Sequence, residues 1–235
     1  MIAARVVMTA AVLAAAGSLG ASPAAAQKKH AARTTARCRV DTSAAWYARQ
    51  RAWLDAAERR GWSDTTFRAA LLRAAGLDAA GAPPVQLGFD VAGIDAPAAA
   101  GTVDSALVAR LDSLAATRSA RWPTSAVVGA AGTRAVWLLA RRDSALARVA
   151  LHRMMEAGPE ESNAADVAVL EDRQRVANGR KQIYGTQFTV AGGRVTLAPM
   201  EDSAHVDLRR EGAGLPPFRL SACLARQAFT AARGR

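Results

Sequence analysis

The sequence predicts a mainly α-helical fold of the α+β type, an alanine-rich helical domain with one small antiparallel β-hairpin near residues 186–198. About a quarter of the 235 residues are alanine, which lets helices pack closely while burying little area. Apolar side chains recur every three or four residues along most of the chain, which is the spacing of one helix face. Apolar and polar residues alternate around Gly192 and Gly193, where glycine suits a tight turn.

Residues 1–26 have the parts of a secretory signal peptide. Met1–Arg5 is short and positively charged, Val6–Leu19 is apolar, and Ala24–Ala26 supplies small residues for cleavage before Gln27. The apolar stretch is short and rich in Ala and Gly for a membrane span, although an uncleaved anchor stays an alternative. We therefore expect export to the periplasm or the extracellular space, with no transmembrane segment after cleavage.

An oxidising compartment gives the two cysteines a structural meaning. Cys38 and Cys223 lie near opposite ends of the mature chain, so the simplest expectation is one disulfide between them. The alternative is a reactive thiol, but the residues around Cys223 match no catalytic cysteine motif. We therefore expect a structural bridge.

The formal net charge of +11 raises the question of an anionic partner, because such a surface attracts nucleic acid, anionic lipid or acidic polysaccharide. Nearly all the basic residues are arginine, as GC-rich coding would produce, and acidic residues interrupt most basic stretches. The one basic cluster, Lys28–Arg39, has no interleaved aromatic residues for base stacking. The sequence therefore predicts no nucleic-acid partner.

A basic linker over 27–40 precedes an N-terminal helical region over 41–120, and we expect residues 41–235 to form one domain. The predicted elements of this region are a helix from Asp41 to Arg60, a helix capped by Ser63 and stopped by Gly76, an irregular loop over 77–103 and a helix capped by Asp104.

The second region, 121–235, is predicted to hold the remaining helices and the hairpin. Its predicted elements are a helix capped by Thr124, a break near Arg142–Ser144, a helix ending at Gly158, a helix capped by Asn163 and stopped by Gly179, the hairpin, a short polar helix near 202–210 and a final helix from Pro217 to about Ala232. Asp166, at the third position after Asn163, is close to a capping box. Two strands alone are marginally stable, so the hairpin must pack on helices.

Six short sequence motifs lie in this second region. They are Trp122-Pro123-Thr124, Val128-Gly129, Leu170-Glu171-Asp172-Arg173, the run Gly179–Gln187, Asp207-Leu208-Arg209-Arg210 and Gly214-Leu215-Pro216-Pro217. Asp-Arg followed by Gln-x-Tyr-Gly-Thr-Gln is the most specific of them. Through these motifs, residues 120–225 resemble a widespread bacterial domain family of unknown function. The resemblance implies a shared fold and no particular reaction.

Two positions depart from the family pattern. Ala120 and Arg141 stand where the resembled family commonly has histidines. If those histidines act in catalysis in other members, the resemblance implies that this chain has lost that activity.

The shared polar residues are the candidate ligand-binding site, at one end of the hairpin. They are Asp172, Arg173, Gln182, Tyr184, Gln187, Asp207, Arg209 and Arg210. In one interpretation, Arg173 and Arg209 bind an anionic group while Tyr184 and Gln187 donate hydrogen bonds. In the other, the same side chains form a buried network that fixes the hairpin against the helices. The two interpretations are compatible.

Histidines offer a weaker signal. His152 and Glu156, four residues apart, together with His205 and Asp207, match no strong metal motif, so the sequence predicts no metal site and no cofactor. The main hypothesis is an exported, non-enzymatic domain that binds a polar or anionic ligand or an envelope partner, or that has a structural role. The alternative is a hydrolase using Asp172, His205 and Asp207.

Overall fold

The computed structural model describes residues 37–78, 85–92, 105–116 and 122–234. The expected signal peptide over 1–26 and most of the basic linker lie outside these ranges, as do Asp104 and Ala120. None of the helices within the described ranges has the length and apolar character needed to cross a membrane.

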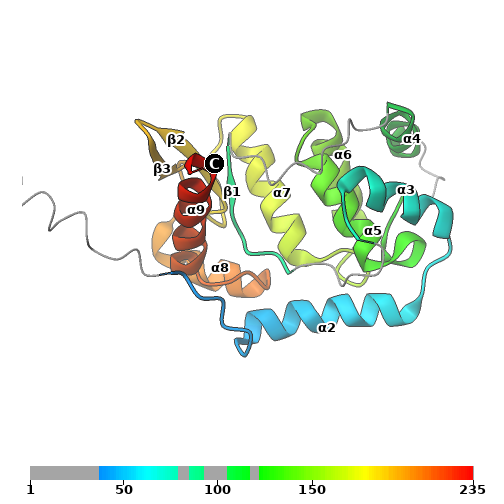
Figure 1. Ribbon diagram of the computed structural model, residues 1–235, viewed down its shortest axis with the longest axis horizontal. Helices are drawn as coiled ribbons and strands as arrows, with labels where there is room; N and C mark the ends of the chain where they lie inside the picture. Colours follow the sequence, from blue (N-terminus) through cyan, green and yellow to red (C-terminus); the bar gives the residue numbers. More distant parts are fainter. Residues whose placement is uncertain (1–36, 79–84, 93–104, 117–121, 235) are drawn as a thin grey trace, which may run out of the picture. The chain divides into compact units, whose positions relative to one another are not determined.

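Eight α-helices and a three-stranded sheet make up the described chain, which confirms the predicted mainly α class. The helices are α2 (Ala45–Arg60), α3 (Thr65–Ala75), α4 (Ser105–Ala116), α5 (Ser125–Ala140), α6 (Ser144–Ala157), α7 (Ala164–Ala177), α8 (Val206–Gly212) and α9 (Phe218–Arg233), and the strands are β1 (Asp90–Val91), β2 (Gln187–Ala191) and β3 (Arg194–Leu197). In Figure 1, α7 lies between the α3, α5 and α6 helices on one side and the sheet with α9 on the other.

Helix caps follow the sequence only in part, since Thr124 precedes α5 as predicted but its side chain makes no cap hydrogen bond. Asn163 caps α7 as predicted, and Asp143, at the predicted break, caps α6; each side chain accepts a hydrogen bond from a backbone N–H in the first turn. The cap of α3 is Asp64 and not Ser63, because the Asp64 carboxylate accepts from the N–H of Phe67 at 2.8 Å.

Helix α5 is kinked at Gly129, whose φ of 69° lies in the left-handed region. The kink frees backbone groups, and charged side chains from α2 and α3 bind them. Glu58 accepts from the N–H of Ala131 at 2.9 Å, and Arg68 donates to the carbonyl of Val128 at 2.7 Å. The bend is therefore tied to both neighbouring helices.

The predicted hairpin is present. Strands β2 and β3 pair antiparallel, with Val190 opposite Val195, and Gly192 and Gly193 form the turn with φ of 56° and 72°. Its apolar face packs on α9, where the rings of Phe188 and Phe218 stack 6.4 Å apart.

Strand β1 lies in the segment predicted as an irregular loop, so that prediction is wrong there. It pairs in parallel with β2 through Asp90 and Val91. Two residues are too few to show alternation in a sequence, and the strand is held by contacts from distant elements. Arg141 and Arg173 both bind the Asp90 carboxylate, the latter at 3.1 Å.

A buried ion pair joins α5 to α7 within the main hydrophobic core of helices α3 to α7. Arg134 binds Asp166, whose carboxylate also accepts from the amide of Gln86 at 3.1 Å. The predicted capping-box role of Asp166 is therefore replaced by this ion pair. Arg134 and Arg141 lie 5.1 and 5.0 Å from the ring centre of Trp137, so their charges also face an aromatic surface.

The predicted disulfide is confirmed. Cys38 and Cys223 are bonded, with their Cα atoms 6.0 Å apart, and the bond ties the residues before α2 to the middle of α9. It closes a loop over 185 positions, for which the chain-entropy model allows at most about 5 kcal/mol of stabilisation.

Candidate functional site

Asp172 is the centre of the predicted polar site and is completely buried on α7. Its two oxygens accept hydrogen bonds from the backbone N–H groups of Ile183, Tyr184 and Thr186 and from the Thr186 hydroxyl, at 2.6 to 3.1 Å. The segment that leads into the hairpin therefore folds around this carboxylate.

Gln182 and Gln187 hold the start of the hairpin together. The buried Gln182 amide accepts from the N–H of Gln187 at 2.8 Å and donates to the carbonyls of Gln187 and Ala198 at 3.1 and 2.8 Å. Gln187 donates in turn to the carbonyl of Val169 on α7, at 3.2 Å. Both amides therefore satisfy backbone groups at a junction between helix and strand.

Arg210 lies beneath the same segment with no exposed surface. Its guanidinium donates to the carbonyls of Pro216, Tyr184 and Gly88, at 2.7, 2.7 and 3.3 Å, and to the hydroxyl of Ser221. Burial lowers the pKa of Arg210 to about 10, an effect opposed by the charges of Asp207 and Asp172.

Arg209 adds hydrogen bonds to this group of polar residues on its solvent-facing side. It donates to the carbonyls of Ile183, Glu201 and Asp202, at 2.9, 2.9 and 2.7 Å. Asp172, Gln182, Gln187, Arg209 and Arg210 are here called the polar junction. They lie together as expected, and the polar groups described above bind other parts of the same chain.

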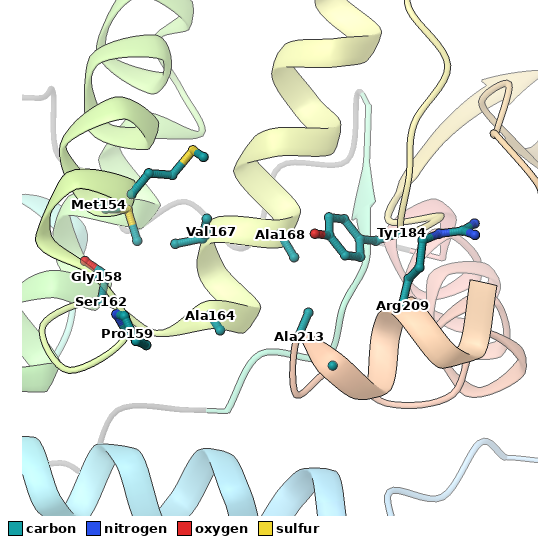
Figure 2. Close-up of a pocket in the computed structure, with 12 residues that line it drawn as sticks. Met154, Gly158, Pro159, Ser162, Ala164, Val167, Ala168, Tyr184, Arg209 and Ala213 are labelled. Atoms are coloured by element: carbon teal, nitrogen blue, oxygen red, sulfur yellow. The ribbon is translucent and has the colours of Figure 1, made fainter. Parts of the chain in front are cut away.

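The remaining candidates act elsewhere. Arg173 binds Asp90 of β1, and Asp207 accepts from the N–H of Phe218 at 2.7 Å, at the start of α9. Tyr184 belongs to the segment around Asp172, but its ring leaves the polar junction and points into a separate hollow, shown in Figure 2.

The residues of the hydrolase alternative have different surroundings. Asp172 is buried among backbone amides, whereas His205 is exposed and pairs with Asp202 at 2.8 Å. His152 is an exposed partner of Glu156, at 3.2 Å. Among the described residues, no group of three or more His, Cys, Asp or Glu side chains is placed to hold a metal ion.

A groove of about 480 Å³ runs between the end of α6, α7 and α8 (Figure 2). We call it the α6–α8 groove. Its lining residues are Met154, Met155, Gly158, Pro159, Ser162, Ala164, Val167, Ala168, Tyr184, Arg209, Gly212 and Ala213. Small residues on α7 leave the space open, and the walls are mainly apolar.

One end of the groove is polar. The Tyr184 hydroxyl points toward Ala168 in Figure 2, and the Glu171 carboxylate on α7 lies within electrostatic reach of it. Burial raises the pKa of Glu171, as does the nearby charge of Asp172. Burial likewise raises the pKa of Tyr184, together with the charges of Glu171 and Asp172. The guanidinium of Arg209 points away from the groove, so only its stem contributes to the wall.

The sequence predictions found Tyr184 and Arg209 and missed the rest of the groove. Its residues come from separate segments, and none of them carries a chemical group that draws attention in a sequence. The local signal is the pair of small residues at Ala164 and Ala168, which in an alanine-rich chain is not distinctive.

Comparison with known proteins identifies a family. A family model described as "Family of unknown function (DUF6624)" matches residues 62–232. No curated protein and no solved structure matches the chain. Because the family match covers well over half of the sequence, the chain belongs to this family of unknown function.

Proposed function

We propose that the protein is an exported, non-catalytic binding domain that holds a small amphipathic molecule in the α6–α8 groove. The observation that carries this proposal is the groove itself. Its volume of about 480 Å³ is in the range of small-molecule sites, and its mainly apolar lining with a few polar groups is also typical of them. Export is supported by the signal-like residues 1–26 and by the disulfide.

The groove is a better ligand site than the polar junction. An incoming ligand at the junction would have to displace hydrogen bonds that Asp172, Gln182 and Arg210 make to the backbone. Breaking buried hydrogen bonds of charged groups costs more than new contacts at the same place would return. The groove offers apolar contact without such a loss.

The exposure of an apolar side chain also supports the α6–α8 groove as the ligand site. Among the described residues the large exposed hydrophobic side chains are Met155, Val190 and Leu208. Leu208, 67% exposed on α8, is not a lining residue, whereas Met155 is 59% exposed and lines the groove. A binding surface accounts for this exposure.

The polar end indicates the chemistry of the ligand. Tyr184 lines the groove, and its hydroxyl can accept a hydrogen bond as well as donate one. An apolar body with an N–H donor at one end therefore fits the groove best.

The test uses N-phenyl-1-naphthylamine, a neutral probe with an apolar body and one N–H group, whose fluorescence rises in apolar surroundings. The exported protein should bind it saturably. Ala164→Trp, at an exposed position in the groove wall, should weaken binding at least about tenfold. Ala52→Trp, at an exposed position on α2, is the matched control and should bind as the parent does. Absence of saturable binding, or equal binding by both variants, would refute the proposal.

A further inference from the structure

Helix α9 carries a straight row of arginines on its exposed side. Arg219, Arg226 and Arg233 are spaced by seven residues, so they lie on one face, and all three are exposed. The row spans about 21 Å along the helix axis. None of these residues lines the α6–α8 groove, so the row is independent of the ligand proposed above.

Two neighbouring segments add to the same face. The disulfide at Cys223 places Cys38 beside the row, and with it the exposed Arg39. At the other end of α9, Arg233 donates to the carbonyl of Gly193 at 3.4 Å, which brings the hairpin turn and the exposed Arg194 close. The basic face is defined here as Arg39, Arg194, Arg219, Arg226 and Arg233.

Acidic residues are lacking in the segments that form this face. Residues 38–40, 186–200 and 212–235 contain no Asp or Glu. At the start of α9, the Asp207 carboxylate accepts a hydrogen bond from the N–H of Phe218. Arginines such as Arg141, Arg173 and Arg175, in contrast, are neutralised by carboxylates.

We propose that the basic face docks the protein on an anionic phospholipid surface. A row of separate guanidinium groups matches an array of phosphates, and charges brought near such a surface add to its attraction. Val190, 40% exposed near the hairpin turn, supplies an apolar side chain for the lipid interface. Phe218 and Phe229 are half-buried, so α9 does not offer the exposed aromatic rings on which bases of single-stranded nucleic acid stack.

The test measures how much of the protein sediments with vesicles of phosphatidylcholine alone or with one third phosphatidylglycerol. The protein is used as it is obtained after export from the cell. We expect binding to the mixed vesicles that falls as salt rises. The triple variant Arg219→Glu, Arg226→Glu, Arg233→Glu should lose at least about tenfold in affinity.

The matched control variant changes the net charge equally at exposed arginines on α2, α3 and α6. It carries Arg59→Glu, Arg73→Glu and Arg148→Glu. This variant should retain most of the binding, because α3, α6 and the C-terminal end of α2 lie away from α9 (Figure 1). An equal loss of vesicle affinity in both variants would show that binding depends on net charge alone, and this would overturn the proposal. So would binding to duplex DNA or to acidic polysaccharide without binding to the vesicles.

Discussion

Thr186 donates two hydrogen bonds to one oxygen of Asp172, from its backbone N–H at 3.0 Å and from its hydroxyl at 2.9 Å. The pair joins α7 to the first residue before β2, so a helix side chain sets where the hairpin starts. Two residues of the most specific sequence motif are thus engaged in folding, and this relationship predicts how the chain responds to their loss.

Asp172→Ala should lower the free energy of unfolding by about 4 kcal/mol, because several buried N–H groups lose their acceptor at once. Asp143→Ala is the control, since Asp143 also accepts from two backbone N–H groups but at the exposed start of α6. It should cost about 1 kcal/mol. Urea unfolding measures both, and equal losses would contradict the central structural role of Asp172.

Arg210→Lys should cost about 3 kcal/mol although it keeps the positive charge. A lysine ammonium cannot reach the carbonyls of Pro216, Tyr184 and Gly88 with the geometry of the guanidinium fork. Arg226→Lys, at an exposed position on α9, should change stability by less than about 0.5 kcal/mol. A tolerated Arg210→Lys would show that charge alone matters there.

Glu171 should make stability depend on pH in a defined direction. Its pKa in the folded protein is raised above the ordinary 4.5, so between 4.5 and the folded value the native state binds more protons than the unfolded state. The contribution of Glu171 to stability therefore falls as pH rises through this range. Glu171→Gln should remove that fall, and parallel stability–pH curves for parent and variant would contradict it.

The same substitution should affect Tyr184. The Glu171 charge contributes to the raised pKa of Tyr184, so Glu171→Gln should lower that pKa toward its ordinary range. Absorbance titration in a Tyr47→Phe background reports Tyr184 alone, because the chain has two tyrosines. An unchanged titration curve would show that the two groups do not interact.

Removal of the disulfide should destabilise the protein by about 2 to 5 kcal/mol. The double variant Cys38→Ser, Cys223→Ser tests this by urea unfolding. Adding a reductant should destabilise the parent by a similar amount and leave the double variant unchanged. A parent that is insensitive to a reductant able to open the bond would contradict the expected contribution.

Much of the fold could be predicted because its signals are local. Asp143 and Asn163 cap helices within their own turn, and Gly192 and Gly193 form a turn whose conformation favours glycine. Strand β1 could not be predicted, because Asp90 is held by Arg141 and by side chains farther along the chain. Its two residues carry no periodicity.

The candidate site shows the same division. The sequence motifs identified Asp172, Gln182 and Arg210 as candidate site residues. The charge and spacing of these residues do not show whether they bind a ligand or the backbone of their own chain. Only the three-dimensional contacts make that distinction. The α6–α8 groove arises where Met154, Val167 and Ala213 leave a space, and tertiary packing alone determines such a space.

The most direct test of the proposed binding site is a methyl NMR spectrum of methionine-labelled protein with and without N-phenyl-1-naphthylamine. Met154 and Met155 line the groove, whereas Met200 lies against Gly185 at the polar junction. The proposal predicts that the probe shifts the methyl signals of Met154 and Met155 and leaves that of Met200 in place. A shift confined to Met200 would place the ligand at the junction and contradict the proposal.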